Sequence, residues 1–167
     1  SGWYAARNHQ PVWNGEYLGA LAQFLQSLDA HGLPPQLFRL SEWDAQWRNP
    51  SPDPGKRAEV EVGTTQLALY AIQSLAYGFV DPTQVHPKWA AIRRQYSSYQ
   101  FLDEALRQGP AGFTATLLKQ VPPQDSRYAE MVKTLARYRD INKLGGWRDL
   151  PATAQPAGSG TKYPELN

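Results

Sequence analysis

Side chains that carry out most enzymatic chemistry are few in this 167-residue chain. The absence of cysteine excludes a thiol nucleophile, disulfides and cysteine-ligated metals. The three histidines, His9, His31 and His86, lack the i, i+4 spacing with which a helix presents two metal ligands. We therefore expect surface or helix-capping histidines, and we predict neither a metal nor a cofactor.

Glu59 and Glu61 are the nearest approach to an acid–base pair. A glycosidase needs two carboxyl groups about 5 Å or about 6.5–9.5 Å apart across a cleft. Two residues of one short segment seldom flank one substrate, so we expect solvent-facing charges here. The glycine-rich segment 158–162 lacks the spacing of a phosphate loop and is interpreted as linker. We predict no catalytic residue.

Aromatic residues are abundant, with six tryptophans and nine tyrosines. Sugars stack on aromatic rings, so one interpretation is a glycan platform. The alternative, which we favour for most of these residues, is that the rings fill gaps where short helices meet, each burying about 150–250 Å². Trp47, beside a proline-rich loop, and Trp147, at the edge of the C-terminal linker, are the candidate glycan or domain contacts.

The composition limits the classes of protein to which this chain can belong. A hydrophobic content of 41 % in 167 residues is enough for one domain with a real core. The net charge is +2 and the basic residues are dispersed, so we expect no nucleic-acid partner. The longest apolar stretch is shorter than the ~20 residues that cross a bilayer, so we expect no membrane span.

We expect the chain to be organised around one apolar stretch, residues 63–80. Its pattern predicts a buried central helix over residues 64–78, capped by Thr64 or Thr65. Gly78 is expected to end this helix in a left-handed conformation, and Pro82 to prevent a restart. Residues 57–62 alternate charged residues with valine and are interpreted as an extended lead-in.

Other segments repeat apolar residues at helical spacing. No strand pair is convincing, so we predict an all-α protein, an irregular bundle of about six to eight helices around the central one. We expect a helical domain over residues 1–147, with Trp147 packing back onto it, and a Pro/Gly-rich linker over 148–167. The other predicted helices cover residues 4–8, 16–31, 37–47, 89–96, 99–108, 113–121 and 126–142.

Four motifs in order resemble the large YcbB-type murein L,D-transpeptidases of Gram-negative bacteria, and the likeness covers about Trp3 to Pro151. The first is WYAARNHQPVW at residues 3–13, and the second is the helix end AHGLPP at residues 30–35. The third is the central helix followed by Gly78, Asp81, Pro82, Val85, His86, Pro87 and Trp89. The fourth consists of Tyr128, Tyr138, Gly145, Gly146, Trp147, Leu150 and Pro151.

This resemblance implies a helical scaffold domain, followed in the family by a peptidoglycan-binding module and a catalytic domain. The family's nucleophile is a cysteine in a His-Gly-Cys type motif, and neither exists here, so no catalytic residue carries over. The expected partners are those two domains of the same protein, with peptidoglycan itself as a further candidate. The expected location is the periplasm, with the signal or anchor segment outside this chain.

Three hypotheses remain. The first is a non-catalytic scaffold fragment of a periplasmic L,D-transpeptidase that forms 3-3 cross-links in the cell wall. The second is a free-standing periplasmic helical module that binds peptidoglycan or a protein. The third is an enzyme such as a lytic transglycosylase, for which Glu59 and Glu61 are the only candidates.

Overall fold

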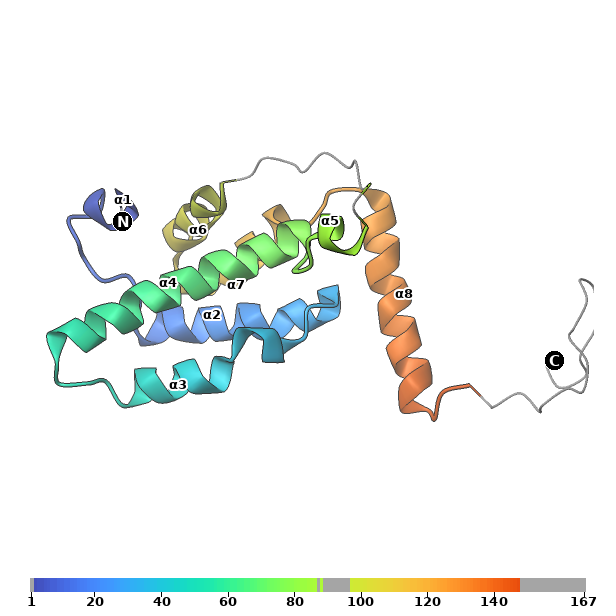
Figure 1. The fold of residues 1–167 in the computed structure, drawn as a ribbon, viewed down its shortest axis with the longest axis horizontal. Coiled ribbons are helices and arrows are strands. Elements are labelled where there is room, and N and C mark those ends of the chain that lie inside the picture. The colour runs from blue at the N-terminus through green and yellow to red at the C-terminus, as the bar shows by residue number, and fades with distance from the viewer. Residues whose placement is uncertain (1, 87, 89–96, 148–167) are drawn as a thin grey trace, which may run out of the picture.

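The computed structural model describes residues 2–86, 88 and 97–147. All regular secondary structure in this part of the chain is helical (Figure 1), which confirms the predicted all-α class. Two 3-10 helices, η1 (Leu28–His31) and η2 (Pro35–Phe38), join the α-helices. Within the described ranges the α-helices are α1 (Gly2–Ala5), α2 (Gly15–Ser27), α3 (Leu40–Arg48), α4 (Pro54–Tyr77), α5 (Pro82–Val85), α6 (Ser98–Arg107), α7 (Gly109–Gln120) and α8 (Ser126–Lys143).

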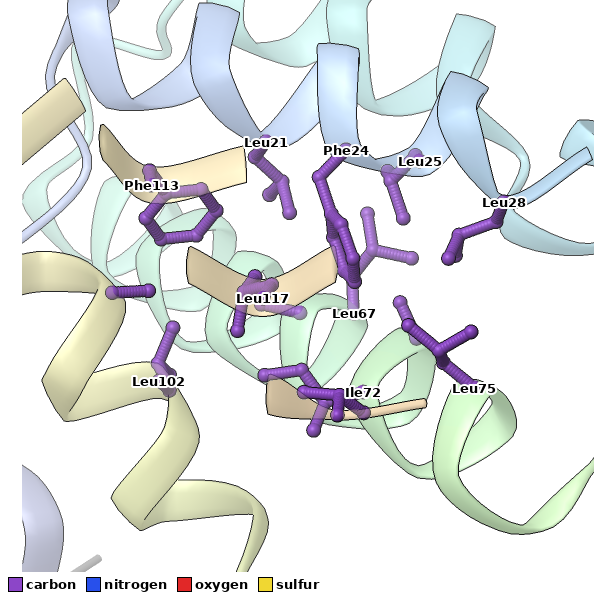
Figure 2. Close-up of a cluster of buried hydrophobic side chains, with 14 of the residues drawn as sticks. Leu21, Phe24, Leu25, Leu28, Leu67, Ile72, Leu75, Leu102, Phe113 and Leu117 are labelled. Carbon is purple, nitrogen blue, oxygen red and sulfur yellow. The ribbon is translucent and has the colours of Figure 1, made fainter. Parts of the chain in front are cut away.

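The hydrophobic core lies where α2, α4, α6 and α7 meet (Figure 2). Each of these helices turns one apolar stripe inward, as the helical spacing of its residues predicts. The contact between α2 and α7 and the contact between α6 and α7 are the most extensive. The buried side chains include Leu21, Phe24 and Leu25 of α2, Leu67, Ile72 and Leu75 of α4, Leu102 and Ala105 of α6, and Phe113 and Leu117 of α7.

The central helix is longer than predicted. α4 begins at Pro54, where Asp53 accepts a hydrogen bond from the backbone N–H of Gly55. Residues 57–62 are therefore helical and not extended, and Thr64 and Thr65 lie buried within the helix instead of capping it. The predicted start is too late because it overlooks Asp53 and Pro54, and an aspartate cap followed by proline is a strong helix start. The short alternation of charge and valine predicts an extended lead-in, but most of it lies on the exposed side of α4.

The far end of α4 agrees better with the prediction. Gly78 ends the helix with φ = 79°, and its N–H donates to the carbonyl of Ser74. Pro82, however, does not prevent a restart, because it begins the short helix α5 with Asp81 as its cap. α4 is also not buried on every side, since Tyr70 is exposed. Among the described residues, no helix combines the length and apolarity that a membrane span needs.

Most of the remaining predicted helices are present. The helix predicted over residues 16–31 appears as α2 continued by η1, and Gly32 ends it in the left-handed region with φ = 79°. The helix predicted over 37–47 is divided at Arg39, whose φ of 47° separates η2 from α3. Helix α1 ends at Ala5, earlier than predicted. The helix predicted over 89–96 and the linker predicted over 148–167 lie outside the described residues.

Helix α8 lies across one end of the bundle, apart from the core (Figure 1). It begins after its cap at Asp125 and ends before Gly145 and Gly146, which confirms the helix predicted over residues 126–142. Trp147 contradicts its prediction, because it is 67 % exposed and rests on Tyr138 of α8, with ring centroids 5.5 Å apart. The reason is geometric: α8 contacts η1, while its C-terminal end points away from the bundle (Figure 1).

Candidate functional site

A groove of about 580 Å³ opens beside the first half of α4. One wall is the N-terminal segment around His9, Pro11 and Trp13, and the other is the end of α3 with the proline-rich loop that follows Trp47. Its base is formed by α4, including Glu61. Its volume falls in the ~300–1,000 Å³ range of small-molecule sites, so it is the candidate functional site.

Glu61 and Thr65 of α4 hold the N-terminal wall in place. The Tyr4 hydroxyl lies 2.7 Å from Thr65 Oγ1 and 3.0 Å from Glu61 Oε1. The backbone N–H of Val12 donates to the same carboxylate oxygen at 2.6 Å. Helix α4 therefore fixes a segment about fifty residues away in sequence, and the hydrogen bonds to the Glu61 carboxylate are stronger than neutral ones.

A second anchor joins the N-terminal segment to α6. Asp103 accepts a hydrogen bond from Trp3 Nε1 at 2.8 Å and pairs with Arg7 at 2.5 Å. The Arg7 guanidinium also lies 3.9 Å from the centre of the Trp3 ring, a cation–π contact. With α4 and α6 both engaged, the wall is attached at two separate points.

Two tryptophans of the groove are hydrogen-bonded to neighbouring threonines. Trp13 Nε1 donates to Thr65 Oγ1 at 2.9 Å, and Trp47 Nε1 donates to Thr64 Oγ1 at 3.0 Å. Thr64 in turn donates to the carbonyl of Val60 one turn earlier, a bond that threonine makes readily within a helix. The two indoles approach α4 from opposite walls, so one helical turn orients both rings.

Burial raises the pKa of Tyr4 to about 12. Its hydroxyl consequently stays protonated throughout the physiological range and can donate to Glu61. Loss of solvent is the largest contribution, and the nearby Glu61 charge adds to it, because a second negative charge beside a carboxylate is unfavourable. The Tyr4 hydroxyl thus serves as a structural donor.

Close packing of α3 on α4 sets the width of the groove. Gly63 lies under the Trp43 ring, and a Cβ at this position would fall 2.9 Å from Trp43 Cζ3 and closer still to Cη2. Trp43 and Trp47 follow each other on α3 with ring centroids 6.5 Å apart. A glycine inside a helix costs about 1 kcal/mol relative to alanine, and here it permits the approach that positions Trp47.

The two tryptophans singled out from the sequence lie in different places. Trp47 lines the groove, whereas Trp147 follows α8 at the opposite end of the bundle from the loop between α3 and α4 (Figure 1). Trp13, Tyr4 and the threonine pair were missed, since nothing local shows that residues 4–13 fold onto α4. The doubled threonine inside an apolar helix was the available signal, and it was interpreted as a cap.

The candidate acid–base residues do not form a pair. Glu61 lines the groove and is hydrogen-bonded, which contradicts the expectation of a solvent-facing charge, while Glu59 is exposed and lines a smaller hollow beside Trp43. On a helix, residues two apart point to different sides, so they cannot face one substrate. Glu61 is the only carboxylate among the described residues that line the groove.

The histidines are dispersed over the fold. His9 stands at the edge of the groove, His31 stacks on Tyr128, and His86 is exposed after α5. Over residues 2–86, 88 and 97–147, no three metal-binding side chains gather into a cluster. The groove, with an indole in each wall and a few polar side chains, is suited to holding a ligand by contact.

Comparison with known proteins gives the family. A family model described as the Scaffold domain matches residues 1–135, most of the chain. No curated protein matches, and no solved structure matches. The matched range contains the whole groove and all of the hydrophobic core. The chain therefore belongs to the Scaffold domain family, the scaffold domain of the YcbB-type L,D-transpeptidases.

Proposed function

We propose that this chain is the non-catalytic N-terminal scaffold domain of a periplasmic L,D-transpeptidase that forms 3-3 cross-links in peptidoglycan. The family match to residues 1–135 carries the proposal. A chain without cysteine cannot supply the thiolate that forms the acyl-enzyme, so that step belongs to another domain of the same protein.

Helix α8 supports a scaffolding role. Its side chains Met131 and Tyr138, together with Leu144 and Trp147 beyond it, are exposed hydrophobic residues. Contiguous exposed apolar surface on a soluble protein marks interaction sites. We propose that this side of α8 contacts the peptidoglycan-binding and catalytic domains.

The gene that encodes these residues provides the first test. We expect a signal or anchor sequence upstream and a domain with a His-Gly-Cys motif downstream. The whole protein, incubated with disaccharide-tetrapeptides, should form 3-3 linked dimers, and its Cys→Ala variant should form none. Dimer formation by residues 1–167 alone would overturn the non-catalytic assignment. A gene without a transpeptidase domain would overturn the assignment of the parent protein as an L,D-transpeptidase.

The groove favours a second candidate, a free-standing periplasmic module that binds peptidoglycan or a protein. Its support is a preformed hollow with two oriented indoles, which scaffolding alone does not require. A stop codon directly after Asn167 in the gene would favour this candidate over the first.

A further inference from the structure

The indole rings of the groove have only carbon surface left to offer. Trp13 and Trp47 are half-buried, and each has its single N–H donor committed to a threonine of α4. The face of an aromatic ring carries partial negative charge, so it attracts the polarised C–H groups of a flat, partly apolar ligand. The rings therefore select a ligand that stacks, and they contribute no hydrogen bond of their own.

Polar groups surround these rings. Gln46 and Ser51 line the wall that carries Trp47, and His9 lies on the opposite wall. Arg57 extends from α4, where its Nη1 donates to the carbonyls of Ser51 and Pro52. Amide, hydroxyl and imidazole groups both donate and accept hydrogen bonds, so they match a ligand rich in hydroxyls.

Glu61 adds an acceptor at the base of the groove. Its Oε1 receives the Tyr4 hydroxyl and the Val12 N–H, while a carboxylate offers about four lone-pair sites on its two oxygens. The remaining acceptor capacity of Glu61 therefore suits a hydroxyl donor that enters the groove.

The groove is also preorganised. Its two walls are both tied to one stretch of α4 through Glu61, Thr64 and Thr65. A ligand that finds its site already formed does not spend binding free energy on ordering side chains. A short ligand with few contacts can then bind measurably.

From these features we infer that the groove binds a short oligosaccharide, with pyranose rings on Trp13 and Trp47 and hydroxyls on the polar rim. A sugar presents an apolar C–H face and a hydroxyl edge, which is the combination that this groove offers. A proline-rich peptide also stacks on indoles, but it brings no side-chain hydroxyl for Glu61. The inference rests on the second candidate function, for which it names the ligand class, and it is independent of the parent enzyme.

The test is a titration of the ¹⁵N-labelled 167-residue chain followed by NMR. The probes are the tetramers of β-1,4-linked N-acetylglucosamine and β-1,4-linked glucose, with an octaproline peptide for comparison. We expect at least one tetramer to shift the indole N–H signals of Trp13 and Trp47, with a Kd in the range of ~1 mM, about −4 kcal/mol. The indole signal of Trp147 should stay in place.

Two variants test the location. Trp47→Ala removes one ring, and Ala58→Trp fills the groove from an exposed position on α4 without touching the core. Each should weaken binding at least tenfold, while Trp147→Ala, the matched control, should bind as the original chain does. If Trp47→Ala fails to fold, Ala58→Trp still decides the location.

Three results would overturn the inference. The first is the absence of any shift with both tetramers at about 10 mM, which places Kd beyond the useful range. The second is unchanged binding in Ala58→Trp. The third is tighter binding of octaproline than of either sugar, which would make the groove a peptide site. None of these results bears on whether the gene encodes a transpeptidase.

Discussion

The four-helix core and α8 have similar sequence patterns but different surroundings. In the core, Leu21, Phe24 and Leu102 are completely buried. In α8 the apolar residues recur at the same helical spacing, yet no residue of the helix is buried and Met131 is 68 % exposed. The difference teaches that an apolar stripe predicts a helix, whereas the burial of that stripe depends on which other elements pack against it.

The attachment of α8 is correspondingly polar. Arg139 forms a two-pronged pair with Asp29 of η1 at 2.8 and 3.0 Å and also donates to its backbone carbonyl. His31 Nδ1 lies 2.7 Å from the Tyr128 hydroxyl, with the two rings stacked. Partly exposed pairs of this kind contribute up to about 1 kcal/mol each. We therefore expect the local unfolding of α8 to need less free energy than unfolding of the core.

Removing a large side chain from each region should give the greatest contrast. Phe24→Ala leaves a cavity in the core and should lower the free energy of unfolding by about 3–5 kcal/mol. Met131→Ala removes an exposed side chain and should change it by less than about 0.5 kcal/mol. Urea denaturation followed by circular dichroism measures both, and similar losses would mean that α8 is covered in solution.

Adding one carbon at the junction of α3 and α4 should have the next largest effect. Gly63→Ala improves helix propensity but places a methyl group against the Trp43 ring, so we expect a net loss of about 1–3 kcal/mol. When Gly63→Ala is made in the Trp43→Ala variant, which lacks the ring, the free energy of unfolding should stay the same or rise. Equal effects in both backgrounds would show that Trp43 does not pack on Gly63.

Breaking the ion pair should affect α8 alone. Arg139→Ala is expected to cost about 1 kcal/mol or less, because both partners are partly exposed. Hydrogen exchange should accelerate in the amides of α8 and remain unchanged in α2 and α4. Lys133→Ala, which breaks an exposed pair within α8, is the control, and faster exchange across the core would contradict the distinction between the regions.

The smallest effect concerns pH. Burial lowers the pKa of His31 below 6.5, so the free form binds a proton more tightly than the docked form. The contribution of His31 to the docking free energy of α8 is therefore complete above pH 6.5. It is lost as the pH falls through the lowered pKa that His31 has in the folded protein. Exchange of α8 amides, corrected for intrinsic rates, should rise over that interval, and His31→Gln should remove the dependence.

Local patterns were sufficient for most helices but not for the groove. Asp125 is a recognisable start, and Gly32 and Gly78 are recognisable ends, so α8 begins and η1 and α4 end where the sequence predicts. The start of α4 was missed because its first turns are exposed and carry no apolar stripe.

The groove depends on contacts between distant segments. Trp47 was identified from its proline-rich neighbourhood, but its counterpart Trp13 comes close only after residues 4–13 fold onto Glu61 and Thr65. Hydrogen bonds that span fifty residues leave no trace in local periodicity. The same limit explains Trp147, whose surroundings depend on where α8 ends relative to the bundle.

The neighbouring rings of Trp43 and Trp47 provide an optical signal. With centroids 6.5 Å apart and planes inclined by 32°, the two indoles are close enough for their electronic transitions to couple. Near-ultraviolet circular dichroism responds to such fixed aromatic packing and vanishes when it loosens. Because Gly63 and Thr64 of α4 hold these two rings, the contribution of the pair, isolated by comparison with Trp43→Ala, should follow the packing of α3 on α4 without any label as ligands, heat or substitutions are applied.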